Sequence, residues 1–181
     1  MRGSRIEVGD FLALDLKQRR ICLIHAKVYA EEERYSAGAS PFHEVYAQVV
    51  KNLEFLNPLH SVTPDRSRRW DESWKWARES ATGVRRIRRT TPTLPSGTAI
   101  AKVVDGFVRS AETTKEVWVV LGNGFPIKDL LGKAVGAGKL PDYHSVQLMY
   151  LLQSCANQVS SVGARLRIFS VDRRPATHHE R

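Results

Sequence analysis

The chain has 181 residues, of which 42% are hydrophobic and 26% are charged, and its formal net charge at pH 7 is +9. This length and composition are typical of one folded domain and exclude a mostly disordered chain. No apolar stretch reaches the roughly 20 residues that span a bilayer, and no signal-peptide pattern is present, so we expect a cytoplasmic protein without a membrane partner. The excess of Lys and Arg favours a nucleic-acid partner, although basic charge alone also suits an acidic protein or an anionic surface.

Two apolar segments at the start of the chain predict a β-hairpin. They cover residues 6–16 and 21–27, and a polar turn joins them. The second segment contains Cys22, which is far in sequence from the only other cysteine, Cys155. Because the two lack metal-ligand spacing, we predict buried free thiols.

A stretch rich in Glu, Ser, Gly and Ala follows the hairpin and predicts a loop, after which a helical pattern begins. Ser40 and Pro41 are suited to the N-cap and the first turn. The pattern predicts a helix over residues 41–55 that ends near Asn57-Pro58. The apolar residues that recur at helical intervals are Phe42, Val45, Tyr46, Val49, Val50, Leu53 and Leu56.

The segment over residues 61–98 is strongly basic and contains three of the tryptophans, Trp70, Trp74 and Trp76. Part of it fits an amphipathic helix with tryptophans inward, so we predict a basic helical insert. Its guanidinium groups would contact the nucleic-acid backbone, with aromatic rings as stacking platforms. The alternative is that the tryptophans are core residues and the arginines a solvated surface. The arginines expected to bind are Arg66, Arg68, Arg69, Arg85, Arg86, Arg88 and Arg89.

Helical and strand patterns alternate in the last part of the chain. We predict a helix over 99–111, a strand over 116–121, helices over 126–135 and 144–162, and a last strand over 165–171, with Gly163 as a helix stop. A helix between strands requires crossover connections. The predicted fold class is therefore α/β, a single domain over residues 1–181 with a small mixed central sheet flanked by helices on both faces.

Three residues of the hairpin could form a catalytic site. Because side chains alternate along a strand, His25 and Lys27 share one face, and the turn lays the first strand, with Asp10, alongside them. On the following helix, Glu44 and Gln48 are one turn apart on the same face. Magnesium-dependent phosphodiester hydrolysis requires oxygen ligands for a hard cation and a cation or base near the attacking water.

The segments GDFLALD, with Asp10, and IHAK, with Lys27, resemble the restriction-endonuclease-like PD-(D/E)XK superfamily. In that family an Asp on one strand is followed by an acid-x-Lys triplet on the next strand and by a helix packed across the hairpin. The resemblance covers about residues 6–56. His25 departs from it, because the family usually has Asp or Glu there and histidine is a poorer ligand for Mg²⁺. Some members move this acid to the following helix, where Glu44 stands, and Gln48 resembles the motif glutamine of RecB-type nucleases.

The resemblance implies a metal-dependent nuclease that hydrolyses phosphodiester bonds, with DNA preferred over RNA as substrate. Asp10 and Glu44 would bind Mg²⁺ or Mn²⁺, Lys27 would orient or activate water and stabilise developing charge, and His25 and Gln48 would assist. Endonuclease and exonuclease action both stay open. The same segments also resemble nuclease-like domains attached to bacterial helicases and phage-defence proteins. Because the family core usually has a helix before its first strand, we expect a fragment of a longer protein that contains helicase or other domains.

A second hypothesis is a catalytically inactive nuclease-fold domain that binds nucleic acid or docks a partner, after losing the acid at position 25. In that case His25 would be a hydrogen-bonded core histidine, Asp10 a strand-edge acid and Lys27 a solvated strand end. Glu44 and Gln48 would form the solvent-exposed face of an amphipathic helix. The oligomeric state stays open in both hypotheses.

Overall fold

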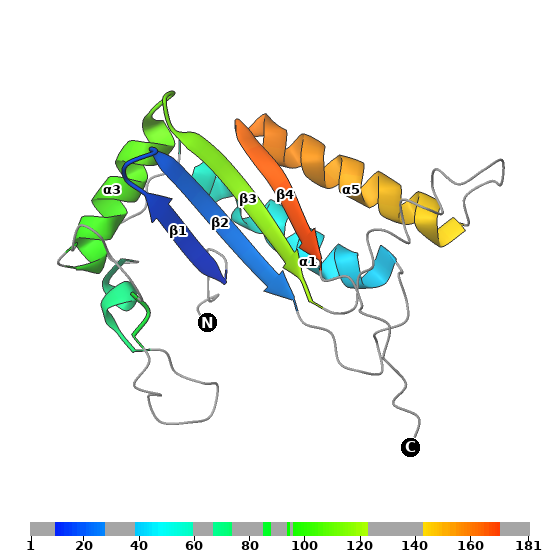
Figure 1. The fold of residues 1–181 in the computed structure, drawn as a ribbon, viewed down its shortest axis with the longest axis horizontal. Coiled ribbons are helices and arrows are strands. Elements are labelled where there is room, and N and C mark those ends of the chain that lie inside the picture. Colours follow the sequence, from blue (N-terminus) through cyan, green and yellow to red (C-terminus); the bar gives the residue numbers. More distant parts are fainter. Residues whose placement is uncertain are drawn as a thin grey trace, which may run out of the picture. The chain divides into compact units, whose positions relative to one another are not determined.

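The computed structural model describes residues 10–27, 39–59, 67–73, 85–87, 94, 96–122 and 143–170. Four strands form one sheet in the order β1-β2-β3-β4 (Figure 1). Their bounds are Phe11–Asp15 for β1, Arg20–Lys27 for β2, Thr114–Leu121 for β3 and Ala164–Ser170 for β4.

The sheet is mixed. In Figure 1 β1 runs opposite to β2, as in a hairpin, whereas β3 and β4 pair in parallel. Strands β2 and β3 are also parallel. Arg19 O accepts from Thr114 N at one end, and Lys27 O accepts from Gly122 N at the other. Both residue numbers increase by the same amount from the first contact to the second, so the two strands run in the same direction. The predicted fold class, a small mixed sheet flanked by helices, is confirmed.

The described helices lie close to their predicted positions. They are α1 (Ala39–Asn52), followed directly by the 3₁₀ helix η2 (Leu53–Leu56), the short η3 (Arg68–Asp71), α3 (Gly97–Arg109) and α5 (Tyr143–Ser161). The structure extends the predicted strand 116–121 by two residues at its start and begins the last strand one residue earlier, at Ala164. The predicted helix over 126–135 lies outside the described residues.

The chain divides into two compact units. Unit 1 consists of Met1–Ala13, Cys22–Leu53 and Lys115–Arg181, and unit 2 of Leu14–Ile21 and Glu54–Thr114. Unit 1 therefore contains α1, α5, β4 and most of β2 and β3, and unit 2 contains most of η2, the basic segment and α3.

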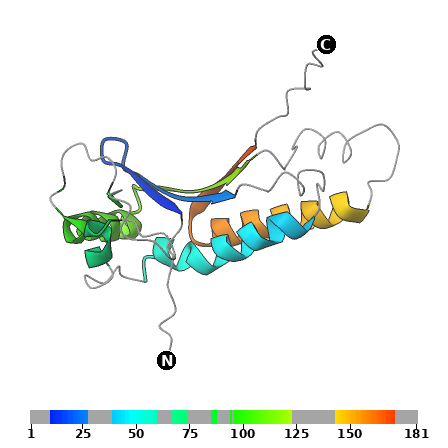
Figure 2. The same ribbon diagram turned by 90° about the horizontal axis from the view of Figure 1, so that it is seen from below.

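In unit 1, α1 and α5 pack against each other and cover the same face of the sheet (Figure 2). Tyr46 Oη and Ser154 Oγ are hydrogen-bonded across the two helices at 2.9 Å. Helices were expected on both faces, but within the described part of this unit only one face carries them. The buried apolar side chains beneath the helices are those of Leu23, Phe42, Val45, Val49, Val117, Val119, Leu121, Leu148, Cys155 and Val159. Each large one stabilises the fold by about 1.5–3 kcal/mol.

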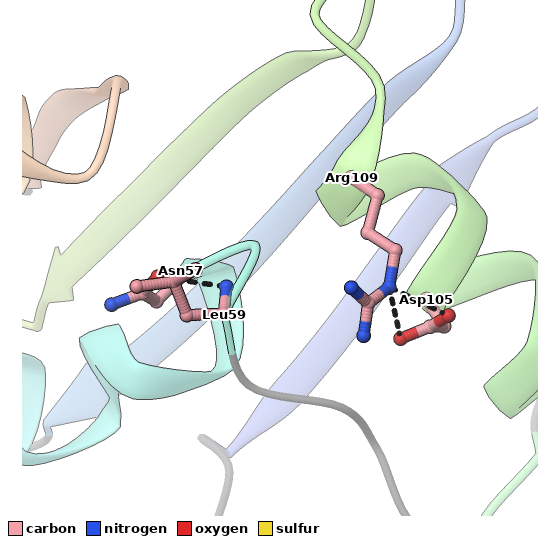
Figure 3. Close-up of polar contacts among 4 residues, drawn as sticks. All are labelled: Asn57, Leu59, Asp105 and Arg109. Atoms are coloured by element: carbon pink, nitrogen blue, oxygen red, sulfur yellow. Dashed lines mark hydrogen bonds and ion pairs between the residues drawn. The ribbon is translucent and has the colours of Figure 1, made fainter.

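In unit 2, the start of α3 is fixed by two side-chain caps. Ser96 Oγ accepts from Ala99 N at 3.2 Å, and Asp71 Oδ1, at the end of η3, accepts from Gly97 N at 2.7 Å. Near the other end of α3, Arg109 Nε donates to Asp105 Oδ2 at 3.0 Å, an i,i+4 ion pair drawn in Figure 3. A large part of this helix is buried, including Ile100, Ala101, Val104 and Val108.

The chain turns after η2 as its sequence predicts. Asn57 Oδ1 accepts from Leu59 N at 3.0 Å across Pro58, a turn in which the Asn side chain replaces a backbone acceptor (Figure 3). The predicted helix end near Asn57-Pro58 is therefore confirmed.

Cys22 and Cys155 are buried thiols, as predicted, and neither is in a disulfide. Burial raises the pKa of the Cys155 thiol to about 11. None of the helices that the structure describes is both long and apolar enough to cross a membrane.

Candidate functional site

The site is built around the end of β2 in unit 1, where Lys27 meets the first half of α1. Lys27 Nζ donates to Glu44 Oε2 at 2.7 Å, and both side chains are substantially exposed. This hydrogen bond, followed by the positive charge of Lys27, lowers the pKa of Glu44. The helical acid and the strand lysine of the sequence pattern are thus adjacent, and Glu44 is a carboxylate at neutral pH.

Asp10 lies at the same end of β2. Its Oδ2 accepts a hydrogen bond of 2.7 Å from the backbone N of Ala26, the residue between His25 and Lys27. The residue is exposed. The hairpin thus holds a second carboxylate next to the strand triplet, where it was expected.

His25 is buried, with 2% of its surface exposed, and the described residues provide no hydrogen-bond partner for its Nε2. Burial lowers the pKa of His25, and the negative charge of Asp10 opposes this shift in part. The imidazole is therefore neutral at pH 7. The alternative prediction was a buried, hydrogen-bonded histidine. The burial agrees with it, but the described residues provide no hydrogen bond to Nε2.

Gln48 is exposed on α1, one turn after Glu44, and Val45 and Val49 beside them are buried. Glu44 and Gln48 therefore belong to the solvent face of the helix. Within the ranges that the structure describes, no three His, Cys, Asp or Glu side chains gather closely enough to hold a metal ion. Of the expected ligands, Asp10 precedes β1 and accepts from Ala26 N, whereas Glu44 lies on α1 and accepts from Lys27 Nζ.

The described part of the basic segment belongs to unit 2. Arg68 and Arg69 lie on η3, and an antiparallel bridge between Ser73 and Arg85 brings Arg85 and Arg86 close to its end. All four arginine side chains are exposed. Arg66, Arg88 and Arg89 lie outside the described residues, as do Trp74 and Trp76, whereas Trp70 is half-buried on η3.

Comparisons with known proteins give no relative. No protein-family model matches the chain, and neither the curated proteins nor the solved structures include a match. The resemblance to the PD-(D/E)XK superfamily therefore depends on the residues of the hairpin and of α1 alone.

One polar cluster in unit 1 was not anticipated from the sequence. Glu116 on β3 is buried, and its carboxylate accepts from Trp118 Nε1 at 2.7 Å and from Arg167 Nε at 3.0 Å. A signal is present as alternation, because Glu116 and Trp118 are two residues apart on β3, as are Arg165, Arg167 and Phe169 on β4. The apolar pattern of residues 116–121 predicts only a strand.

Proposed function

We propose that the chain is a metal-dependent nuclease domain that hydrolyses phosphodiester bonds in DNA. The observation that carries the proposal is the contact of 2.7 Å between Lys27 Nζ and Glu44 Oε2, with Asp10 at the same strand end. It supports the expectation that the acid missing from position 25 is replaced by one on the following helix. A lysine paired with one carboxylate, with a second carboxylate at the same strand end, is an arrangement suited to phosphate chemistry.

The proposed metal ligands are Asp10 and Glu44, whose carboxylate oxygens suit Mg²⁺ or Mn²⁺. Among the described residues, His25 does not lie close enough to this pair to complete a group of three ligands. When bound, such a cation would stabilise the developing negative charge of the phosphate and make water a better nucleophile. Because Glu44 is paired with Lys27, metal binding would replace a hydrogen bond that the carboxylate already accepts.

Each remaining residue has a role that its own chemistry allows. The Lys27 ammonium can donate to a non-bridging phosphate oxygen and so stabilise the charge that develops there. Gln48, on the solvent face of α1, can donate to or accept from the substrate. His25 stays neutral, because burial lowers its pKa, and would assist from within the strand triplet. The net charge of +9 and the exposed arginines of unit 2 favour a polyanionic substrate.

Purified protein incubated with supercoiled and with linear DNA, in Mg²⁺ or Mn²⁺, tests the proposal. We expect cleavage that EDTA stops, that Asp10→Ala and Lys27→Ala abolish, and that Lys102→Ala, an exposed lysine of α3, leaves unchanged. Nicking of the supercoiled form would indicate an endonuclease, and loss of linear DNA alone an exonuclease. Activity that survives in both site variants would refute the assignment.

The second candidate is a catalytically inactive domain that binds nucleic acid. It is favoured by the absence of a three-ligand group from the described residues and by a buried, neutral His25 in place of an acid. It predicts salt-dependent binding without metal-stimulated hydrolysis, so the same assay separates the two candidates.

A further inference from the structure

The sheet of unit 1 has a second face, opposite to α1 and α5, on which no described helix lies (Figure 2). Alternation along the strands assigns its residues, because Val117 and Val119 are buried beneath the helices and their neighbours point the other way. The register of β3 and β4 places Trp118 beside Arg167, Glu116 beside Arg165, and Val120 beside Phe169. We call this surface the open face, and its residues on β3 and β4 are Glu116, Trp118, Val120, Arg165, Arg167 and Phe169.

Two aromatic rings meet on the open face. The ring centroids of Trp118 and Phe169 are 5.2 Å apart with the planes tilted by 58°. Phe169 is 43% exposed and Trp118 is half-buried, so both rings present surface to solvent. An exposed aromatic pair on a regular sheet indicates a surface that another molecule covers.

A buried carboxylate fixes part of this surface in position. Glu116, with 2% of its surface exposed, accepts from the indole Nε1 of Trp118 and forms an ion pair of 3.0 Å with Arg167 Nη2. Burying a carboxylate is costly unless it is paired, and Trp118 and Arg167, which pair with this one, both belong to the open face. The indole and the guanidinium group are thereby oriented before a ligand arrives, which reduces the entropy cost of binding.

The charge on the open face selects among partners. Arg165 and Arg167 are exposed and lie two residues apart on β4, beside the aromatic pair. Arg167 has five N–H donors, more than Glu116 Oε1 can accept. A purely apolar partner would cover Arg165 and the donors of Arg167 that Glu116 does not engage, whereas a strand of nucleic acid offers a flat base for each ring and a phosphate for each guanidinium.

We propose that the open face binds single-stranded nucleic acid, with bases stacked on Trp118 and Phe169 and phosphates held by Arg165 and Arg167. The site does not depend on the proposed hydrolysis, since it lies on the other side of the sheet from the Glu44 pair and uses none of its residues. It would hold an unpaired strand, because stacking on a sheet surface requires bases that are not already stacked in a duplex.

Fluorescence anisotropy of labelled dT12, rU12 and a 12-base-pair duplex, in EDTA at several salt concentrations, measures this binding without cleavage. We expect both single strands to bind more tightly than the duplex, and the ratio of the DNA and RNA affinities shows which is preferred. Trp118→Ala and Phe169→Ala should each weaken binding about 5- to 100-fold, the range found for loss of one stacked base. Trp118→Phe, which keeps a ring, should stay within about threefold of wild type.

Charge and aromatic controls complete the experiment. Arg165→Ala should reduce the slope of log affinity against log salt by about 0.7, as for one lost contact to a single strand. Tyr150→Ala, an aromatic residue of α5 that is 74% exposed, and Lys102→Ala should leave affinity nearly unchanged. Circular dichroism of each variant verifies that it is folded.

Three results would overturn the proposal. One is that wild type binds neither dT12 nor rU12. Another is that Trp118→Ala and Phe169→Ala bind the single strands as wild type does. The measured affinity would then come from the overall positive charge of the protein and not from stacking. The third is a wild-type dimer in sedimentation that Trp118→Ala dissociates, which would make the open face a contact between copies of the chain. Because the measurements contain EDTA, failure of DNA cleavage leaves their interpretation unchanged.

Discussion

Lys27 on β2 and Glu44 on α1 are joined by a hydrogen-bonded ion pair of 2.7 Å. The pair connects the last residue of a strand to a helix that begins at Ala39. It holds a carboxylate and an ammonium group at the strand end where Asp10 accepts from the backbone of Ala26. Ionisation of Glu44 is thus the first property of the candidate site that can be measured.

The pKa of Glu44 should depend on Lys27. In the folded chain this pKa lies below its ordinary value of 4.5, so the pair is present at neutral pH and is lost as the pH falls through the lowered value. In Lys27→Met we expect the pKa of Glu44 to rise to its ordinary range. A carbon NMR titration of the Glu44 carboxyl group in both proteins measures this. Equal pKa values would show that the ion pair is not formed in solution.

Replacement of His25 should separate stability from activity. His25→Leu removes a buried nitrogen to which none of the described residues is hydrogen-bonded, so we expect the free energy of unfolding at pH 7 to rise by about 1 kcal/mol. If the imidazole assists the site, DNA cleavage falls in the same variant. Urea unfolding and the cleavage assay, run on the same preparations, test the two effects together. A loss of stability would mean that the Nε2 atom has a partner in solution.

The same histidine should make stability depend on pH. Because burial lowers its pKa in the folded chain, the unfolded chain binds a proton first, and stability is lost as the pH falls below about 6.5. The loss continues until the pH reaches the lowered pKa of the folded state. We expect a smaller decrease between pH 7 and pH 5 in His25→Leu than in wild type. Identical decreases would assign the pH dependence to other groups.

The Glu116 cluster should couple two strands. Arg167→Ala takes the ion-pair partner from a carboxylate that is 2% exposed, and we expect a cost of about 2 kcal/mol. Adding Glu116→Gln should recover part of this loss, because the buried charge is then removed as well. Arg165→Ala, two residues away on the same strand, should cost less than about 1 kcal/mol. Additive effects of Arg167→Ala and Glu116→Gln in a double-mutant cycle would contradict the coupling.

Two glycines of α3, Gly97 and Gly106, differ in the space around them and can be compared by substitution. A Cβ on Gly97 would lie 2.3 Å from Ser67 O and 2.9 Å from Trp70 Cβ, so η3 would have to shift. A Cβ on Gly106 would meet nothing within 4 Å. We therefore expect Gly97→Ala to destabilise the protein by about 1–3 kcal/mol and Gly106→Ala to stabilise it by about 0.5–1 kcal/mol. Thermal unfolding of both variants measures the difference, and equal effects would mean that η3 does not pack on α3.

Regular periodicity made much of the fold predictable. The apolar spacing of Phe42, Val45 and Val49 gave α1 its buried face, and these side chains are almost completely buried. Gly163 was predicted to end a helix, and it adopts a left-handed φ of 71° directly after α5 and before β4. Such features are local, because a few neighbouring residues determine them.

The candidate sites could be predicted only in part. Alternation placed His25 and Lys27 on one face, and helical spacing placed Glu44 and Gln48 together. Whether Lys27 reaches Glu44 depends on how α1 lies on the sheet, which the sequence pattern does not specify. The burial of Glu116 depends on the register that sets Trp118 beside Arg167, two segments that are far apart in the chain. Long-range pairing of this kind leaves no local pattern.

Isothermal titration calorimetry with Mn²⁺ tests the central claim most directly, namely that Asp10 and Glu44 share a divalent cation. We expect one site in wild type and an affinity at least about tenfold weaker in both Asp10→Asn and Glu44→Gln. Asp105→Asn, which changes a carboxylate paired with Arg109 on α3, should bind as wild type does. Absence of Mn²⁺ binding to wild type, or binding that both site variants retain, would contradict the account.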